Sequence, residues 1–276
     1  MLHQTEIDRL NSLCRRFRKD LIEVLHERQT GHPGGSLSVC EILTVLLLAE
    51  MRVDPADPDR IDRDRLILSK GHAAPMLYRV LAERGFFPVE ELHTLRTLNT
   101  RMQGHPCLSD TPGVDMTSGP LGLGLSVGLG AAIGLQKQGL PARVYVVLGD
   151  GELNEGTIWE AAMAAAKFRP ENLTAIVDYN GVQLDGPTAS VMPEGDLKAK
   201  FEAFGWQVLT CDGHDVSALY DALQTAKAAV AKPVVILAKT VKGKGVSFME
   251  GQSAWHGKAI DDAHYEIAMR ELGGAD

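Results

Sequence analysis

The 276-residue sequence has little of what several common classes of protein require. Its four cysteines, Cys14, Cys40, Cys107 and Cys211, are widely spaced and form no CxxC pair. This spacing argues against a disulfide framework or a cysteine zinc site and indicates a reducing compartment, so we expect a cytoplasmic protein. Basic residues number 28 against 36 acidic ones, and the net charge of −8 gives nucleic-acid binding no electrostatic support.

Long hydrophobic runs are also scarce. The N-terminus is polar and charged, unlike a signal peptide. The longest apolar stretch covers residues 119–135, which is marginal in length for a membrane span. Its glycines offer GxxxG spacing, but the five glycines after Pro120 and the lack of aromatic anchors make a poor lipid-facing helix. We therefore expect no membrane span, and instead a buried helix whose glycines admit another backbone or a cofactor.

What the sequence does contain is an alternation of helical segments and short apolar runs. Hydrophobic content of 45% and charge of 23% are typical of a globular protein, and the length suits one large α/β domain. Helices are predicted at 5–27, 38–50, 75–84, 119–135, 155–168, 196–204, 216–230 and 260–271. Strands are predicted at 66–68, 144–148, 173–178, 206–210 and 234–238. The sequence has no internal repeat or linker, so we predict a single domain over residues 1–276. This domain should contain a parallel β-sheet flanked by helices on both faces.

The most informative stretch, residues 143–186, has the pattern of a strand, a helix and a second strand. The apolar run at 144–148 stops at Gly149-Asp150-Gly151, and Asn180 lies just past the strand predicted at 173–178. A crossover of this length implies parallel strands with a right-handed connection. Because open α/β sheets bind ligands at the carboxyl ends of their strands, we expect Asp150 and Asn180 side by side at that edge.

A carboxylate and an amide oxygen in this position suit a hard divalent cation. Mg²⁺ usually takes one or two protein side chains and completes its octahedron with phosphate oxygens and water. The glycines beside Asp150 let the backbone turn sharply and approach a ligand closely. The N–H of Gly151 and the start of the next helix would face the anion. The stretch therefore predicts a site for a metal-bridged diphosphate; the alternative is an ordinary βαβ unit with a turn glycine.

Four of the nine histidines lie in turn-forming contexts. They are His32, His72, His105 and His256. Each alone would normally be a surface or hydrogen-bonded histidine, but four converging on a diphosphate site predict a proton-handling pocket. Their scatter along the chain does not fit a zinc site. Lys242 and Lys244, on a glycine-containing loop, either contact a substrate anion or belong to a solvated hinge.

These residues resemble a known family. Gly149-Asp150-Gly151 followed after about thirty residues by Asn180 resembles the thiamine diphosphate motif. The sequence of residues 149–186 is similar to that of transketolases in particular. The loops at 30–35, 69–73, 104–106, 119–122 and 255–257 match that family as well, so the resemblance covers essentially the whole chain. It implies the thiamine diphosphate-binding fold, with Mg²⁺ (or Ca²⁺) held by Asp150, Asn180 and the carbonyl of Val182.

The resemblance also implies roles for individual residues. His72 and Gly151 would contact the cofactor diphosphate, beside Gly149. His105 would face the C1 hydroxyl of the two-carbon fragment. His32 and His256 would lie near the hydroxyl that gains or loses a proton when the C2–C3 bond forms or breaks.

Three further positions follow from the same resemblance. Gly119 and Leu121 would border the thiazolium and pyrimidine rings of the cofactor. Glu155 would couple active sites across a subunit interface; alternatively, it is a helix N-terminal acid favoured by the dipole. Leu123 stands where the family usually has glutamine, which puts one local polar contact in doubt.

The family also implies a partner. The glutamate that assists deprotonation of thiamine diphosphate lies in a second, pyrimidine-binding domain of transketolases, whereas this chain stops at Asp276 after the first. The resemblance therefore implies the N-terminal subunit of a split transketolase, active only with a separate C-terminal subunit, as an α2β2 assembly. The pair would transfer a two-carbon ketol unit from a ketose, or ketose phosphate, to an aldose.

Three alternatives remain open at this point. One is the α subunit of a thiamine-dependent 2-oxo acid dehydrogenase, although Asp178-Tyr179-Asn180 lacks the usual Asn-Asn of that family. Another is a non-catalytic module that keeps the fold. A nicotinamide-binding protein is the least supported, because no GxGxxG opens a helix after the first strand.

Overall fold

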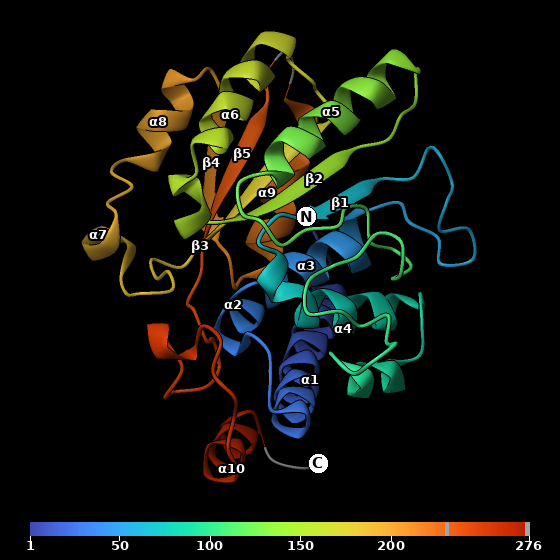
Figure 1. Ribbon diagram of the computed structural model, residues 1–276. Coiled ribbons are helices and arrows are strands. Elements are labelled where there is room, and N and C mark those ends of the chain that lie inside the picture. The colour runs from blue at the N-terminus through green and yellow to red at the C-terminus, as the bar shows by residue number, and fades with distance from the viewer. Residues whose placement is uncertain (230–231, 274–276) are drawn as a thin grey trace.

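A computed structural model describes residues 1–229 and 232–273, and it contains one sheet of five parallel strands (Figure 1). The strands are β1 (Arg65–Leu68), β2 (Val144–Gly149), β3 (Leu173–Tyr179), β4 (Gln207–Asp212) and β5 (Val234–Lys239). Their order across the sheet is β1-β2-β3-β5-β4. The predicted parallel α/β architecture is confirmed, and β2 and β3 are direct neighbours as expected.

Helices cover both faces of this sheet (Figure 1). One layer contains α1 (Gln4–Arg28), α3 (Cys40–Val45), α4 (Ala74–Arg84) and α9 (Val216–Ala228), and the opposite layer contains α5 (Gly124–Lys137), α6 (Gly156–Phe168) and α8 (Leu197–Ala203). The remaining helices are α2 (Pro33–Ser38), α7 (Thr188–Val191) and α10 (Asp262–Glu271). Short 3-10 helices occur at η2 (Gly71–Ala73), η3 (Val89–Thr94), η4 (Gly151–Asn154) and η5 (Ser253–Trp255), and η1 (Leu46–Glu50) is a π-helix.

The strands are apolar on both sides because each side packs against a helical layer. Val147 and Ile176, which are paired across β2 and β3, belong to the core under α1, α3 and α4. The preceding pair, Val146 and Ala175, belongs to the core under α5 and α6. Successive strand residues point to opposite faces, so a sheet covered on both sides has continuous apolar strands, as the sequence indicated.

The start of the second helix was predicted wrongly. Pro33 and the glycines after it were expected to form a loop up to Ser38, but α2 begins at Pro33 itself. Proline suits the first helical position, since its missing N–H would have no partner there and its φ is already helical. Ser38 caps no helix; its hydroxyl bonds the carboxylate of Asp178 at 2.6 Å. His32 accordingly lies at the N-cap of α2.

One other helix start also differs from prediction. The glycine-rich helix begins at Gly124 because residues 119–122 form a turn in which Gly122 has a φ of +87°. The helix after the Gly149–Gly151 turn begins at Gly156, preceded by the 3-10 helix η4. Residue 230, the predicted end of the helix before β5, lies outside the described residues, and α9 ends at Ala228. Within the described part of the chain, no helix combines the length and apolarity needed to cross a bilayer.

Candidate active site

A cleft lies at the carboxyl ends of β2 and β3. It brings together eight residues that the sequence analysis selected: His72, Leu121, Gly149, Asp150, Gly151, Asn180, Val182 and His256. The geometry explains why they meet. Gly149 pairs with Asp178 in the sheet register, so Asp150 and Asn180 emerge from adjacent strand ends. The central geometric prediction, that these two side chains share one site, is confirmed.

Asp150 is buried, with 2% of its surface exposed, and its carboxylate is held by backbone amides. The N–H of Gly151 donates to Oδ1 at 2.8 Å, and the N–H of Gly181 donates to Oδ2 at 2.5 Å. Burial, together with the nearby charge of Asp178, raises the pKa of Asp150 to about 6. Among the described residues no lysine or arginine forms an ion pair with this carboxylate, so a divalent cation would supply the missing positive charge.

The N–H of Gly151 therefore does not face the cleft as an anion donor, contrary to expectation. It is used by Asp150, and η4 separates the turn from the start of α6. The absence of a side chain at Gly151 has a different consequence. A Cβ at this position would lie 2.7 Å from the Cβ of Gln183, so only glycine lets the two loops approach this closely.

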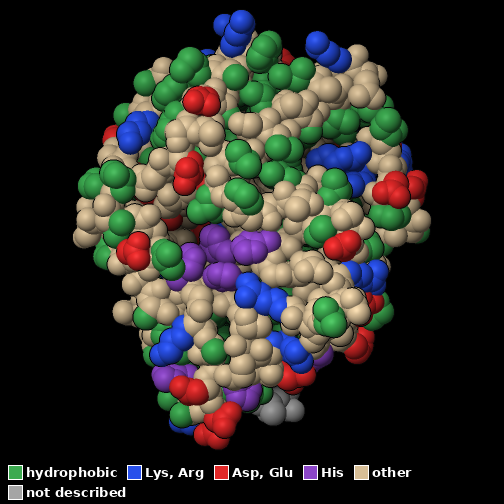
Figure 2. Space-filling view, viewed as in Figure 1, with side chains coloured by type: hydrophobic (Ala, Val, Ile, Leu, Met, Phe, Trp, Pro, Cys, Tyr) green, Lys and Arg blue, Asp and Glu red, His purple; other side chains and the backbone are tan. Residues whose placement is uncertain are grey.

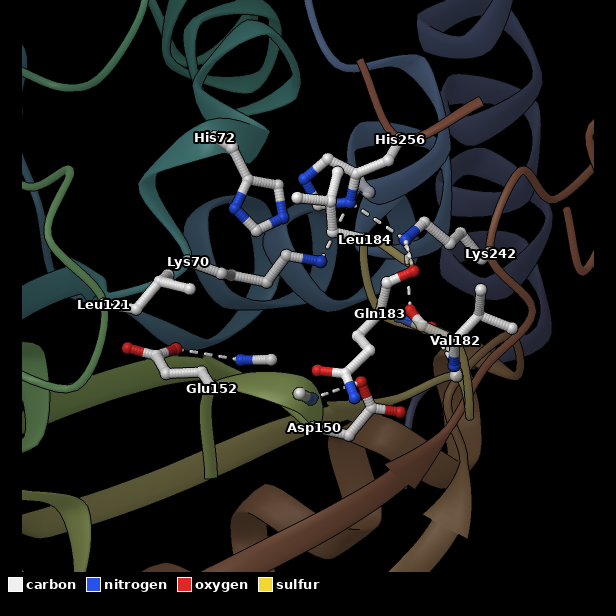
Figure 3. Close-up of a pocket in the computed structure, with 14 residues that line it drawn as sticks. Lys70, His72, Leu121, Asp150, Glu152, Val182, Gln183, Leu184, Lys242 and His256 are labelled. Atoms are coloured by element: carbon white, nitrogen blue, oxygen red, sulfur yellow. Dashed lines mark hydrogen bonds between the residues drawn. The ribbon is translucent and has the colours of Figure 1, made fainter. Parts of the chain in front are cut away.

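The other two predicted metal ligands lie on the loop after β3. The side-chain oxygen of Asn180 accepts the N–H of Val182 at 3.1 Å. The carbonyl of Val182 accepts a hydrogen bond from the ammonium group of Lys242 at 3.0 Å (Figure 3). This carbonyl therefore faces the cleft, where a cation would take the place of the Lys242 ammonium. Carboxylate, amide and carbonyl oxygens are the donors Mg²⁺ prefers, so the residues present fit the metal.

Lys242 is a cleft residue, and the expectation of a solvated hinge is wrong for it. Only 2% of its surface is exposed, and its Nζ also contacts the carbonyl of Gln183 at 3.3 Å and Nδ1 of His256 at 3.0 Å. Burial, and then the charge of Lys70, lowers the pKa of Lys242 to about 8. Lys244 points elsewhere, where it pairs with Glu250 at 3.7 Å.

The four predicted histidines form one cluster. The ring of His32 lies 5.6 Å from His72, 6.0 Å from His105 and 5.5 Å from His256. Figure 2 shows histidine side chains gathered beside a hollow near the middle of this face. Burial, and after it the charge of nearby cations, lowers the pKa of each ring. The pKa falls to about 4 for His32 and to about 3 for His256, and the pKa values of His72 and His105 are lowered as well. All four are therefore neutral at pH 7, a state in which imidazole both donates and accepts hydrogen bonds.

Five predicted residues are not among those that line the cleft: His32 and His105 of the histidine cluster, and Gly119, Leu123 and Glu155. Gly119 is next to the histidine cluster, since a Cβ there would lie 3.7 Å from the ring of His105. Leu123 is partly exposed at the N-cap of α5, where the family usually has glutamine. Glu155 is exposed at the N-cap of α6 and makes no side-chain capping bond, so its proposed role at an interface remains a prediction.

Sequence reasoning missed two buried polar groups that support the cleft. Lys70 forms an ion pair with Asp178, and its Nζ donates to the carbonyl of Gly35 at 3.1 Å. Glu152 accepts the hydroxyl of Ser69 and the N–H of Gly122 at 2.8 Å, which ties three loops together. Polar residues at the ends of otherwise apolar strands were a signal that could have identified Lys70 and Asp178.

Comparison with known proteins gives consistent matches along the chain. Residues 10–276 match the family described as transketolase, thiamine diphosphate binding domain. A 6-deoxy-6-sulfo-D-fructose transketolase subunit from Clostridium sp. (strain MSTE9) is 44% identical, with 93% of each chain covered. An apulose-4-phosphate transketolase subunit from Phocaeicola vulgatus is 38% identical, with 97% of this chain and 95% of the relative covered.

Solved structures agree with this assignment. A transketolase from Pichia stipitis, in complex with sedoheptulose 7-phosphate, superposes with a TM-score of 0.90 at 30% identity. The match covers 96% of this chain but only 41% of the Pichia protein. The human transketolase is 38% identical, and again the match spans 43% of its length. This chain therefore corresponds to less than half of the single-chain enzymes and to nearly the full length of the two relatives named as subunits.

Proposed function

We propose that this chain, which belongs to the transketolase family of thiamine diphosphate-binding domains, is the cofactor-binding subunit of a two-component transketolase. The observation that carries the proposal is the meeting of Asp150 and Asn180 at the ends of two adjacent strands, in one cleft with His72 and His256 of the histidine cluster. With its partner the chain would transfer a two-carbon ketol unit from a ketose to an aldose. The family assignment favours this interpretation over a 2-oxo acid dehydrogenase subunit.

The residues of this chain would hold the cofactor through its diphosphate. Asp150, Asn180 and the carbonyl of Val182 would bind Mg²⁺, with Ca²⁺ as a substitute, and the metal would supply positive charge for the diphosphate. His72 and Lys242, which also line the cleft, would face the diphosphate. Bound thiamine diphosphate would supply the nucleophilic carbon and the electron sink of the reaction.

The histidine cluster would handle substrate protons. His32 and His256 would exchange the proton of the sugar hydroxyl next to the bond that breaks or forms, and His105 would bind the C1 hydroxyl. Their lowered pKa values leave both rings neutral near pH 7, a state that forms hydrogen bonds with a hydroxyl but binds a proton only weakly. Since the Lys242 ammonium can only donate, Nδ1 of His256 accepts, so the hydrogen of the neutral ring is on Nε2, which would donate to a substrate oxygen.

A separate subunit would complete the site. Leu121 and Leu184 line the cleft yet are exposed, at 38% and 60%, which leaves an apolar rim for another chain to cover. We propose a C-terminal, pyrimidine-binding subunit in an α2β2 assembly in the cytoplasm. Sugars and sugar phosphates are the proposed substrates. Because two relatives are named for a sulfonated ketose and a ketose phosphate, the substrate panel should contain both classes.

The test is calorimetric titration of the purified chain with thiamine diphosphate and Mg²⁺, comparing the wild type with Asp150→Ala. We expect weak binding by the wild type and a loss of affinity of about 100-fold or more in the variant, because the only charged metal ligand is removed. The exposed Glu160→Ala is the matched control and should bind like the wild type. Equal binding by Asp150→Ala and the wild type would reject the site.

A further inference from the structure

A buried group of charged side chains lies behind the cleft, on the far side of the loop that carries Lys242. We call residues 240–245 the Lys242 loop. The loop is fixed to neighbouring backbone at Gly243, whose N–H donates to the carbonyl of Gly34 at 2.9 Å, and at Thr240, whose N–H donates to the carbonyl of Tyr179 at 3.1 Å. The side chains behind it come from elements distant in the sequence and take no part in the proposed chemistry.

The centre of the group is Glu41 on α3. Its two oxygens accept both terminal nitrogens of Arg18, at 2.6 and 2.7 Å, in a bidentate ion pair. Both residues are buried, at 5% and 6% exposure. The third nitrogen of the guanidinium, Nε, donates to the carbonyl of Lys244 at 3.1 Å. Arg18 therefore binds the C-terminal half of the Lys242 loop while it neutralises Glu41.

His214, which follows β4, binds the other half of the loop. Its Nδ1 lies 2.8 Å from the carboxylate of Glu41, and its Nε2 lies 2.8 Å from the backbone nitrogen of Val241. A backbone N–H can only donate, so Nε2 is the acceptor and the ring hydrogen is on Nδ1, where it donates to Glu41. The carboxylate thus fixes the tautomer of the imidazole, and the imidazole fixes the position of Val241.

A metal site is the competing explanation for this cluster. The ligand atoms of Cys14, Cys40 and Glu41 lie within 4.8 Å of one another. However, both carboxylate oxygens of Glu41 already bond Arg18 or His214, and the guanidinium charge beside them would repel a cation. The directed bonds from this cluster lead to the Lys242 loop.

We infer that Arg18, Glu41 and His214 are positioning residues that hold Lys242 against the metal and diphosphate end of the cleft. The inference rests on the proposed function. The bonds run from Glu41 through His214 to Val241, and the next residue places its ammonium 3.0 Å from the carbonyl of Val182. Loss of the imidazole acceptor would leave the partly buried N–H of Val241 without this partner, which favours release of the loop.

The experiment compares His214→Ala and His214→Gln with the unaltered chain. Amide hydrogen exchange is followed for peptides that cover residues 240–251, and the dissociation constant for thiamine diphosphate is measured with excess Mg²⁺. In His214→Ala we expect exchange in the Lys242 loop at least about tenfold faster, and cofactor binding weaker by about tenfold. His214→Gln should recover most of both properties, because its side-chain oxygen can accept the N–H of Val241.

His93→Ala is the matched control, because His93 also contacts a glutamate, Glu27, through Nδ1 but is exposed on η3. It should leave both measurements unchanged. If His214→Ala fails to fold, His214→Gln, measured against His93→Gln, carries the test. Binding equal to that of the wild type in His214→Ala, or no rescue by glutamine, would overturn the inference. A wild-type chain that does not bind the cofactor would instead overturn the proposed function.

Discussion

Glu194 is a buried carboxyl that forms no ion pair with a basic side chain of the described residues. It lies between α7 and α8 with 5% of its surface exposed, and its Oε1 is buried with no hydrogen-bond partner in that part of the chain. Burial, followed by the charge of Asp150, raises the pKa of Glu194 to about 7. A carboxyl that holds its proton more tightly in the folded chain than in the unfolded chain weakens the fold once the solution pH exceeds the unfolded value.

We therefore predict that Glu194→Gln stabilises the chain at pH 8, by about 1 kcal/mol after allowance for solvent screening. The gain should shrink as the pH falls from 7 and disappear below pH 4.5, where the carboxyl is protonated in both states. Urea unfolding at several pH values checks this, with the exposed Glu160→Gln as control. A gain that is the same at pH 4.5 and pH 8 would show that the charge of Glu194 is not its cause.

At the residue scale, the side chains that sequence reasoning found share one property: each lies within a short local pattern. Asp150 is flanked by glycines, and His32, His72, His105 and His256 lie beside glycine or within a turn-forming motif. His214 and Glu41 could not be identified in this way, because their function depends on partners 173 positions apart in the chain. Such partners are set by the packing of α3 against the β4–α9 connection.

The element with the least usual composition is α5, which is rich in glycine. Its glycines are not equivalent. A Cβ at Gly128 would lie 2.4 Å from a methyl group of Val146 on β2, whereas a Cβ at Gly130 would meet no atom within 4 Å. Gly128 therefore allows the helix to lie close to the sheet, and Gly130 faces open space.

We predict opposite effects for the same substitution at these two positions. Gly128→Ala should lower the free energy of unfolding by about 1–3 kcal/mol, because the added methyl group overpacks the contact with Val146. Gly130→Ala should raise it by up to about 1 kcal/mol through helix propensity. Thermal and urea denaturation of the two variants measure the difference directly. Destabilisation of similar size at both positions would mean that helix packing does not distinguish them.

Among the boundaries of helices and strands, the helix starts were predicted least well from the sequence patterns. Pro33 was interpreted as a helix breaker, yet it begins α2, because proline is unfavourable only where its missing N–H was needed. The strands were predicted more closely, within two residues at each end. Continuous apolar runs bounded by turns leave few alternative registers in a sheet buried on both faces.

For the whole molecule, the chain spans about two fifths of the transketolase structures it resembles, and the apolar rim of its cleft faces solvent. We predict that the purified chain shows no ketol transfer alone and gains it when a C-terminal transketolase subunit is added. The physical reason is that the group needed to deprotonate thiamine diphosphate is expected on that partner.

The assay combines the chain, the partner, Mg²⁺, thiamine diphosphate, a ketose donor and an aldose acceptor, and product aldose and ketose are measured. A mixture in which the chain carries Asp150→Ala is the control and should be inactive. Turnover by the chain without any partner would contradict the prediction. Release of CO₂ from pyruvate by the reconstituted pair would instead indicate 2-oxo acid chemistry.

The sequence by itself determined the α/β class, the parallel order of β2 and β3, and the meeting of Asp150 with Asn180. These follow from short-range rules, since a crossover connection has one hand and the carboxyl ends of parallel strands share one edge. Only the tertiary structure decided that Lys242 is buried against Val182, and that Arg18, Glu41 and His214 support the loop from behind. Those contacts join segments far apart in the chain, and only side-chain packing selects which distant polar groups become partners.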